Sequence, residues 1–183
     1  MVRNSLFIVF FLLLNSCSSF KRNDNGIPRV SKNQFSKLDP VELPFDTQST
    51  IYKLKANFYQ SENEIKYYKL VKPKKNINFF LVFLENGKVA TIATEMINKD
   101  SLDPKRGQMG FYGQKKGKIF IERFYRGDGG GYVSHEEMKI YDNDSIVLIE
   151  KNRGITSSKR TGWASSYTPV KVTKGFLELR PDW

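Results

Sequence analysis

Apolar and polar side chains alternate along much of the chain after residue 50. Between residues 51 and 59, an apolar residue stands at every even position from 52 to 58. A period of two is typical of a β-strand with one buried face. No window of twelve or more residues shows a strong helical period, although Ser61–Glu64 has a capping-box sequence that could open a short helix. The pattern predicts an all-β body with at most one short helix.

Turn sequences divide this body into hairpins. Asn86-Gly87 lies between two β-rich runs and predicts a two-residue type I′ turn, because both central residues of that turn have positive φ. Two further hairpins are predicted around residues 114–117 and 142–144, and one or two closing strands between 167 and 179. The count is about eight strands in an antiparallel meander, which forms either a lipocalin-like barrel or a β-sandwich.

The first 16 residues have a different character. Arg3 precedes Leu6–Leu14, an unbroken run of nine apolar residues. As a helix this run is about 14 Å long, less than half of the ~30 Å hydrocarbon core of a bilayer, so a signal peptide is expected and not a membrane span. The run ends in Leu14-Asn15-Ser16-Cys17, which resembles the lipobox of bacterial lipoproteins.

This resemblance implies a modification and a location. In lipoproteins the Cys sulfur receives a diacylglycerol, the signal peptide is cut just before the Cys, and the new amino terminus is acylated. It therefore implies a lipid anchor on Cys17 that holds the protein on a bilayer in the bacterial cell envelope. Ser18 follows the Cys, and no Asp stands there as an inner-membrane retention signal, so the outer membrane is expected.

Residues 17–49 are expected to link this anchor to the body. Most of them are polar or charged, and Pro28, Pro40 and Pro44 interrupt them. Their apolar residues follow no period, so the segment is predicted to be a flexible linker with a reach on the order of 30 Å. The predicted organisation is a signal peptide over 1–16, a lipidated Cys with a linker over 17–49, and a β-domain over 50–183.

The β-domain itself resembles that of small uncharacterised bacterial lipoproteins with a lipocalin-like fold. The resemblance covers most of the body and is carried by turn sequences and alternation, at residues 54–59, 83–89, 110–121 and 140–148. It implies a barrel whose interior or surface binds a ligand or an envelope partner. The run of glycines at 129–131 departs from the family pattern.

Composition limits the chemistry. The chain has one Cys and one His, which excludes a disulfide framework, a Cys/His zinc site and an iron–sulfur cluster, so no metal or cofactor is expected. His135 lies beside Ser134 on a predicted strand, where neighbours point to opposite faces, and is expected to be a surface residue.

The net charge of +11 points to an anionic partner. One basic stretch interleaves lysines with Tyr67 and Tyr68, a pattern that can bind single-stranded nucleic acid. An exported protein meets anionic glycans, lipid headgroups or acidic proteins instead, so no nucleic acid is expected; the alternative is a merely solvated face. The lysines of this candidate basic surface are Lys66, Lys69, Lys72, Lys74 and Lys75.

A second candidate site is the glycine-rich stretch from Arg126 to Tyr132, which interrupts the strand pattern. The spacing of a phosphate-binding loop is absent, so the stretch is read as a mobile inter-strand loop or as the rim of a ligand-binding barrel. Its candidate contact residues are Arg126, Asp128 and Tyr132.

Three functions stay open at this point. The first is a non-enzymatic ligand-binding or interaction module, with no catalytic residues. The second is a structural scaffold whose interior is filled by its own side chains. The third is a hydrolase of envelope polymers that uses paired carboxylates such as Asp128, Glu136 and Glu137.

Overall fold

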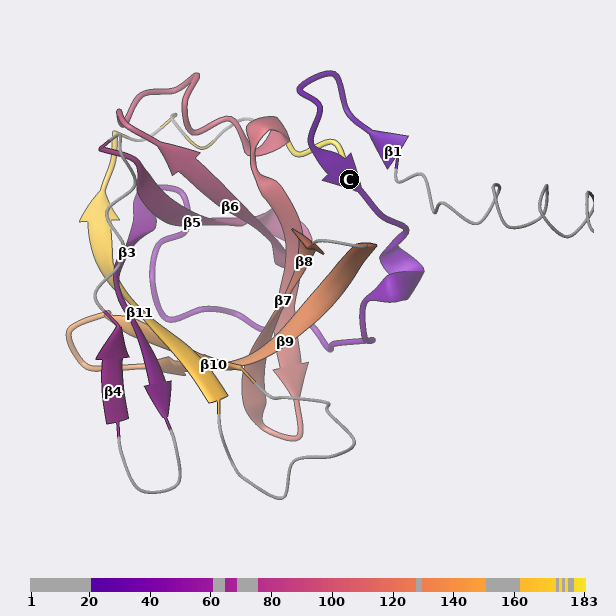
Figure 1. The fold of residues 1–183 in the computed structure, drawn as a ribbon. Helices are drawn as coiled ribbons and strands as arrows, with labels where there is room; N and C mark the ends of the chain where they lie inside the picture. Colours follow the sequence, from indigo (N-terminus) through magenta and orange to yellow (C-terminus); the bar gives the residue numbers. More distant parts are fainter. Residues whose placement is uncertain are drawn as a thin grey trace, which may run out of the picture.

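Eight strands of the protein form a closed antiparallel barrel, seen in Figure 1 almost along its axis. The computed structural model describes residues 21–60, 65–68, 76–127, 130–150, 162–173, 175, 177 and 180–183. The strand order is β3-β5-β6-β7-β8-β9-β10-β11, and β11 pairs back with β3 to close the barrel. The barrel strands are β3 (Thr50–Gln60), β5 (Asn78–Leu84), β6 (Lys88–Thr94), β7 (Gln108–Lys115), β8 (Lys118–Gly127), β9 (Gly130–Ile140), β10 (Ile146–Glu150) and β11 (Gly162–Lys171).

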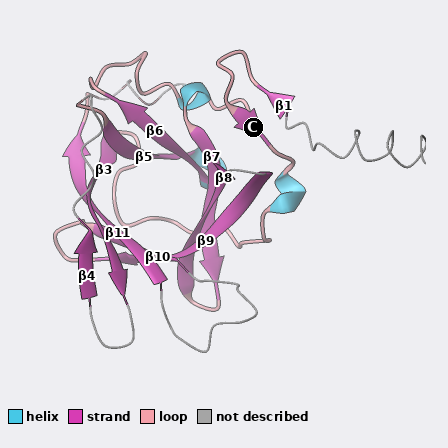
Figure 2. Ribbon diagram, in the orientation of Figure 1, coloured by secondary structure: helices cyan, strands magenta, loops and turns pink. Residues whose placement is uncertain are grey.

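The smaller elements decorate this barrel. β4 (Ile65–Tyr68) pairs with the second half of β3, and β1 (Lys21–Arg22) pairs with β2 (Pro28–Arg29) in a separate two-stranded sheet. Three short 3-10 turns, η1 (Lys32–Gln34), η2 (Glu85–Gly87) and η3 (Pro104–Arg106), are the only helical elements among the described residues (Figure 2). The predicted all-β antiparallel meander is confirmed, and its barrel form is present.

Two turns show how local sequence sets the hairpins. β5 and β6 form the predicted hairpin, and Asn86 and Gly87 both have positive φ, as expected. The connection has three residues, Glu85–Gly87, and not two, because the ladder ends at the Leu84–Lys88 pair. The two-residue turn with two positive φ values is instead Lys116-Gly117, between β7 and β8.

The glycine-rich stretch lies at a strand-to-strand turn. β8 runs to Gly127 and β9 begins at Gly130, with Arg126 paired to Gly131. The inter-strand loop predicted across 127–131 is therefore shorter than expected. Gly127, Gly130 and Gly131 belong to the strands, because a glycine has the same backbone hydrogen-bonding groups as any other residue of a ladder. β4 has no counterpart in the sequence prediction, and the expected helix at Ser61–Glu64 lies outside the described residues.

One end of the barrel is filled and covered. Inward-facing apolar side chains from seven strands form its core, against which Leu43 and Phe45 of the segment before β3 pack. Figure 1 shows this segment crossing the barrel. The ring of Phe45 lies 4.8 Å from that of Tyr52 and 5.3 Å from that of Phe83, centroid to centroid. We call this the plugged end. Its buried core consists of Tyr52, Leu81, Phe83, Val89, Ile121, Met138, Ile146, Leu148 and Tyr167.

The chain termini cover the outside of the barrel. The N-terminal segment buries Phe35 against Phe111 of β7, and the C-terminal residues Leu177 and Trp183 pack on the outer faces of the strands. Arg29 and Asp182 join the two termini with an ion pair of 2.8 Å. From Lys21 on, the segment expected to be a flexible linker is thus packed on the barrel: Phe35 lies on the outer face, and Leu43 and Phe45 lie on the core of the plugged end.

Glu122, on the outer face of β8, binds the N-terminal segment through a hydrogen bond. It is 1% exposed, accepts a hydrogen bond from the Ser36 amide at 2.6 Å, and lies 2.5 Å from Nδ1 of His135. The His135 ring stacks on Phe120. His135 is on the outer surface of the barrel, as expected, but its side chain is largely covered, at 15% exposed.

Candidate binding site at the aromatic end of the barrel

Exposed aromatic side chains gather at the end of the barrel opposite the plug. The antiparallel register places the start of β5, the end of β8 and the start of β11 at this end. Phe79, Tyr132 and Trp163 occupy inward-facing register positions there and are 37%, 56% and 47% exposed. Tyr132 stacks on Tyr125 across the β8–β9 ladder, with ring centroids 5.6 Å apart. We call this the aromatic end.

A buried ion pair lies one layer below these rings. Arg123 of β8 and Glu136 of β9 are 4% and 6% exposed. The guanidinium donates to both carboxylate oxygens, Nε to Oε2 at 2.7 Å and Nη2 to Oε1 at 2.5 Å. This bidentate geometry gives a stronger and more directional contact than a single charge-assisted bond.

Neutral groups satisfy the rest of this pair. Nη1 of Arg123 donates to the Tyr167 hydroxyl at 3.3 Å and to Oγ1 of Thr91 at 3.4 Å. Ser134 lies 3.3 Å from the Glu136 carboxylate. The cluster is therefore a connected polar network, and such a network fixes the positions of its members when each one is bonded.

Burial and the charges in this network shift the pKa values of Arg123 and Tyr125. Burial alone would lower the pKa of Arg123, but the adjacent Tyr167 and Glu136 raise it above the ordinary arginine value. Burial raises the pKa of Tyr125 above its usual range, even though the Arg123 guanidinium, 5.2 Å from the Tyr125 ring centroid, opposes this shift. Both residues thus keep one protonation state at neutral pH.

Glu150 adds a second carboxyl to the same layer. It lies directly opposite Glu136 in the β9–β10 ladder, where facing Cβ atoms are about 5 Å apart. Burial raises the pKa of Glu150, and so does the negative charge of Glu136, while the Arg123 guanidinium opposes these effects. The net shift moves the pKa of Glu150 toward neutrality.

A bulge in β3 completes the polar lining. The β3–β11 register shifts at Ser166/Tyr167, so that Ser165 faces Asn57 while Tyr167 faces Leu54. Oγ of Ser165 donates to Oδ1 of Asn57 at 2.7 Å. A bulge reverses the inward parity of a strand. Before the bulge the even-numbered Leu54 faces inward, and after it the odd-numbered Asn57 does, so that the Asn57 amide lies at the aromatic end.

The structure places the predicted site residues at different locations. Tyr132 is at the aromatic end, whereas Arg126 is exposed and points outward, since it pairs with Gly131 on the other parity of the ladder. Glu136 and Glu137 point to opposite faces of β9, and Glu137 pairs with Lys118 at 3.2 Å. These two carboxylates therefore do not converge. Cys17, Asp128, Lys69, Lys72, Lys74, Lys75 and the side chain of Lys66 lie outside the described residues.

Arg123, Glu136, Tyr167 and Trp163 were not predicted as a cluster. The available signal was parity: in β8 the inward positions read Ile119, Ile121, Arg123 and Tyr125, so a charged residue continues an apolar row. A buried charge needs a partner, but the sequence alone does not say which strand supplies it.

The described residues also bear on the presence of a pocket, a metal site and a membrane-spanning helix. A hollow of about 520 Å³ lies beside the plugged end, between the β5–β6 turn and the C-terminal segment, and only Phe83 of its lining comes from the barrel core. In the part of the chain that the structure describes, no three His, Cys, Asp or Glu residues converge as metal ligands. None of the helical turns in that part has the length or apolar character of a membrane span.

Searches of protein-family models, curated proteins and solved structures found no match to this chain.

Proposed function

We propose that the protein is a non-enzymatic binding module of the bacterial cell envelope, anchored to a bilayer through lipidated Cys17 and carrying its binding surface at the aromatic end. The observation that supports this most is the contrast in exposure along the barrel axis. Large aromatic rings at inward-facing positions are buried at the plugged end and exposed at the aromatic end, although exposing them costs hydrophobic free energy.

The chemistry of this end defines a class of ligand. Trp163, Tyr132 and Phe79 offer flat apolar faces, and Asn57, Ser165 and Glu150 offer hydrogen-bonding groups beside them. Arg123 is already neutralised by Glu136, so a full negative charge on the ligand is not required. A molecule with an apolar or ring-shaped body and a few hydroxyl or amide groups fits this surface, as do the sugar rings of envelope glycans.

A dye titration tests the binding surface. An anilinonaphthalene sulfonate dye, whose fluorescence rises in an apolar site, is titrated into the protein and into Trp163→Ala, Tyr132→Ala and Tyr141→Ala. Tyr141 is a matched control, since it is 51% exposed and lies at the plugged end. Loss of an aromatic contact residue typically costs 1–2 kcal/mol of binding, so the first two variants are expected to bind about tenfold more weakly. Equal affinities of all three variants would contradict the proposal.

Palmitate labelling tests the anchor separately. Label is expected in the native chain and absent from Cys17→Ala, because the thioether to the lipid forms on the cysteine sulfur. Label that persists in Cys17→Ala would disprove the anchor and leave the dye result unaffected.

One observation favours hydrolysis of an envelope glycoside as a second candidate function. Glu136 and Glu150 face each other on neighbouring strands, and the raised pKa of Glu150 suits a general acid. Against it stands the pairing of both Glu136 oxygens with Arg123. Release of reducing ends from purified peptidoglycan that is lost in Glu150→Gln would establish this function; no release by the native protein would eliminate it.

A further inference from the structure

The loop that follows β6 exposes two large apolar side chains. Met96 is 66% exposed and Ile97 is 43% exposed, and Phe79, 37% exposed, lies nearby because it pairs with Ala93 at the end of β6. Among the described residues, five of the six exposed large hydrophobic side chains lie at the aromatic end; Tyr141 is the sixth. A concentration of this kind on one side of a protein marks an interaction surface.

Hydrogen bonds fix this loop in the shape that exposes Met96 and Ile97. Oγ of Ser101 donates to the Met96 carbonyl at 2.6 Å, and the Met96 amide donates to Oγ1 of Thr94 at 3.2 Å. The Ser101 amide donates to Oδ1 of Asn98 at 2.8 Å. Leu102 is 0% exposed and anchors the loop in the outer core. These hydrogen bonds and the buried Leu102 fix the loop on the barrel, while Met96 and Ile97 at its tip stay exposed.

The beginning of the described chain lies beside this loop. Residues of the β1–β2 hairpin and of the loop line one hollow of about 300 Å³. Asn23 also donates to the Lys105 carbonyl at 2.6 Å, and Arg29 donates to the Gly107 carbonyl at 3.1 Å. The residues lining the hollow are Asn25, Ile27, Ile92, Ala93, Thr94, Ser101 and Arg106.

The distance along the chain from Cys17 to this hairpin is short. Only Ser18, Ser19 and Phe20 separate Cys17 from Lys21 in β1. Four residue steps span at most about 14 Å even when fully extended. A lipid on Cys17 therefore holds the β1–β2 hairpin close to the bilayer surface and leaves no room for a long tether.

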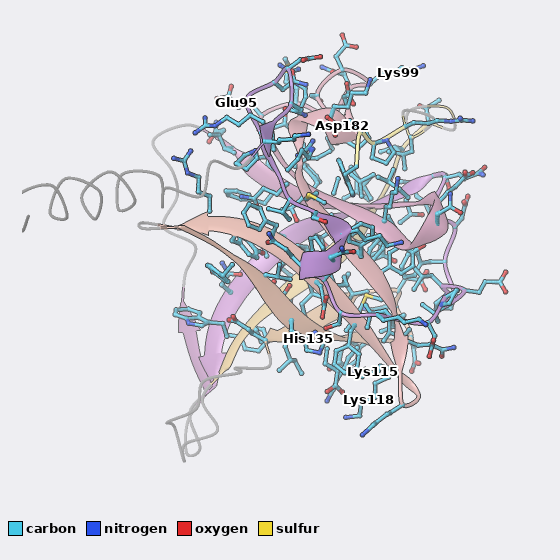
Figure 3. All side chains as sticks on the ribbon, turned by 90° about the vertical axis from the view of Figure 1, so that its right-hand side faces the viewer. Glu95, Lys99, Lys115, Lys118, His135 and Asp182 are labelled. Carbon is cyan, nitrogen blue, oxygen red and sulfur yellow. The ribbon has the colours of Figure 1, made fainter. Side chains whose placement is uncertain are left out.

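The segments beside the apolar tip carry more exposed basic than acidic residues. Five basic side chains are exposed on the β1–β2 hairpin, the loop after β6 and η3, compared with three exposed acidic side chains in the same segments. Figure 3 shows Lys99, Glu95 and Asp182 on one side of the molecule, away from Lys115 and Lys118. Exposed apolar residues with basic neighbours fit an anionic bilayer surface. The basic residues are Lys21, Arg22, Lys99, Lys105 and Arg106, and the acidic ones are Asp24, Glu95 and Asp100.

We propose that Met96, Ile97 and Phe79, with the basic residues around them, dock the barrel onto the surface of the bilayer that carries its anchor, with anionic phospholipid headgroups as the partner. This proposal rests on the Cys17 anchor of the proposed function and adds the orientation of the body. Its consequence is that the aromatic end faces the bilayer surface, so a ligand of that end is an amphiphile or headgroup met at the membrane.

Quenching of single tryptophans by brominated lipids tests the orientation. Trp163→Phe and Trp183→Phe remove the two native tryptophans, and either Ile97→Trp or Tyr141→Trp introduces one reporter. Each lipidated protein is reconstituted in vesicles of phosphatidylethanolamine and phosphatidylglycerol with bromine on the acyl chains. Docked apolar residues enter the boundary of headgroups and acyl chains, so the Ile97→Trp reporter is expected to lose roughly half of its fluorescence. The Tyr141→Trp reporter is expected to lose almost none.

A measurement on the native sequence guards against a folding defect in these variants. Trypsin cleavage after Lys99 is expected to be slower in vesicles than in detergent, while cleavage after Lys115 proceeds equally in both. Met96→Gln with Ile97→Gln is expected to remove this protection, because both side chains are exposed and their loss leaves the core intact.

The outcomes separate this proposal from the anchor. Quenching of neither reporter, or of the Tyr141→Trp reporter alone, overturns the docking proposal while the protein still sediments with vesicles. Failure of the protein to sediment with vesicles, together with absence of lipid on Cys17, overturns the anchor. Docking is then tested by adding the two unlipidated reporter variants to vesicles from solution. An unquenched Ile97→Trp reporter in that experiment overturns the docking proposal as well.

Discussion

The plugged end and the aromatic end of this barrel are built on the same strands from different side chains. At the plugged end the inward positions carry Phe83, Tyr52 and Leu148, each at most 1% exposed, and the segment before β3 covers them. At the aromatic end the inward positions carry a buried ion pair, with half-exposed rings above it. The first arrangement removes apolar area from water, whereas the second keeps apolar area in contact with water.

This difference assigns different tasks to the two ends. Burial of apolar side chains is the main favourable term in folding, so the plugged end supplies most of the stability of the barrel interior. A buried ion pair contributes little net stability but fixes the positions of its groups. The aromatic end is therefore held in place by its polar network while its rings stay exposed, as the proposed binding surface requires.

The largest expected effect is on the core of the plugged end. Phe83→Ala removes a ring that contacts the rings of Phe45, Tyr52 and Tyr112, and should lower the free energy of unfolding by about 3–5 kcal/mol. Urea unfolding followed by circular dichroism measures this change. Tyr141→Ala, the exposed control, should change the free energy of unfolding by less than about 0.5 kcal/mol. A small effect of Phe83→Ala would mean that the interior is not tightly packed at this end.

The ion pair of the aromatic end should respond differently to single and double substitution. Arg123→Met leaves the Glu136 carboxylate buried without its bidentate partner and should cost about 3 kcal/mol, at the low end of the usual range because Ser134 still lies within hydrogen-bond distance. Adding Glu136→Leu removes the unpaired charge and should restore most of the loss. Equal unfolding free energies of the single and double variants would show that the pair itself stabilises the barrel.

The plugged end was easier to predict from the sequence than the aromatic end, for a physical reason. Strand parity in runs such as 52–58 comes from local alternation, and the positive φ values of the Asn86-Gly87 turn come from backbone sterics, so both follow from neighbouring residues. Closure of the barrel by β3 and β11 joins residues more than 100 positions apart, and no local pattern encodes that pairing.

The cluster at the aromatic end depends on the same kind of long-range pairing. Arg123 meets Tyr167 only because β11 completes the circle, and Ser165 meets Asn57 only because of the bulge in β3. The packed N-terminal segment was missed for a related reason. Phe35 and Leu43 follow no period: Phe35 is buried against the outer face of the barrel, whereas Leu43 is half-buried against the core of the plugged end.

The smallest expected effect is a pH-dependent one at Glu150. Burial and the neighbouring Glu136 raise the folded-state pKa of this carboxyl above its unfolded value, so folding favours the neutral form. Its favourable contribution is complete below the unfolded pKa and is lost as the pH rises through the folded pKa. Glu150→Gln is neutral at every pH and should therefore show a higher Tm than the native protein at pH 7, with the difference shrinking toward pH 4. Thermal unfolding across this range measures it, with Glu42→Gln, an exposed carboxyl on the segment before β3, as the control for the substitution itself. A Tm difference that does not change with pH would mean that the Glu150 carboxyl is solvated and has its ordinary pKa. The aromatic end would then have no desolvated carboxyl, and in this respect it would not differ from the rest of the surface.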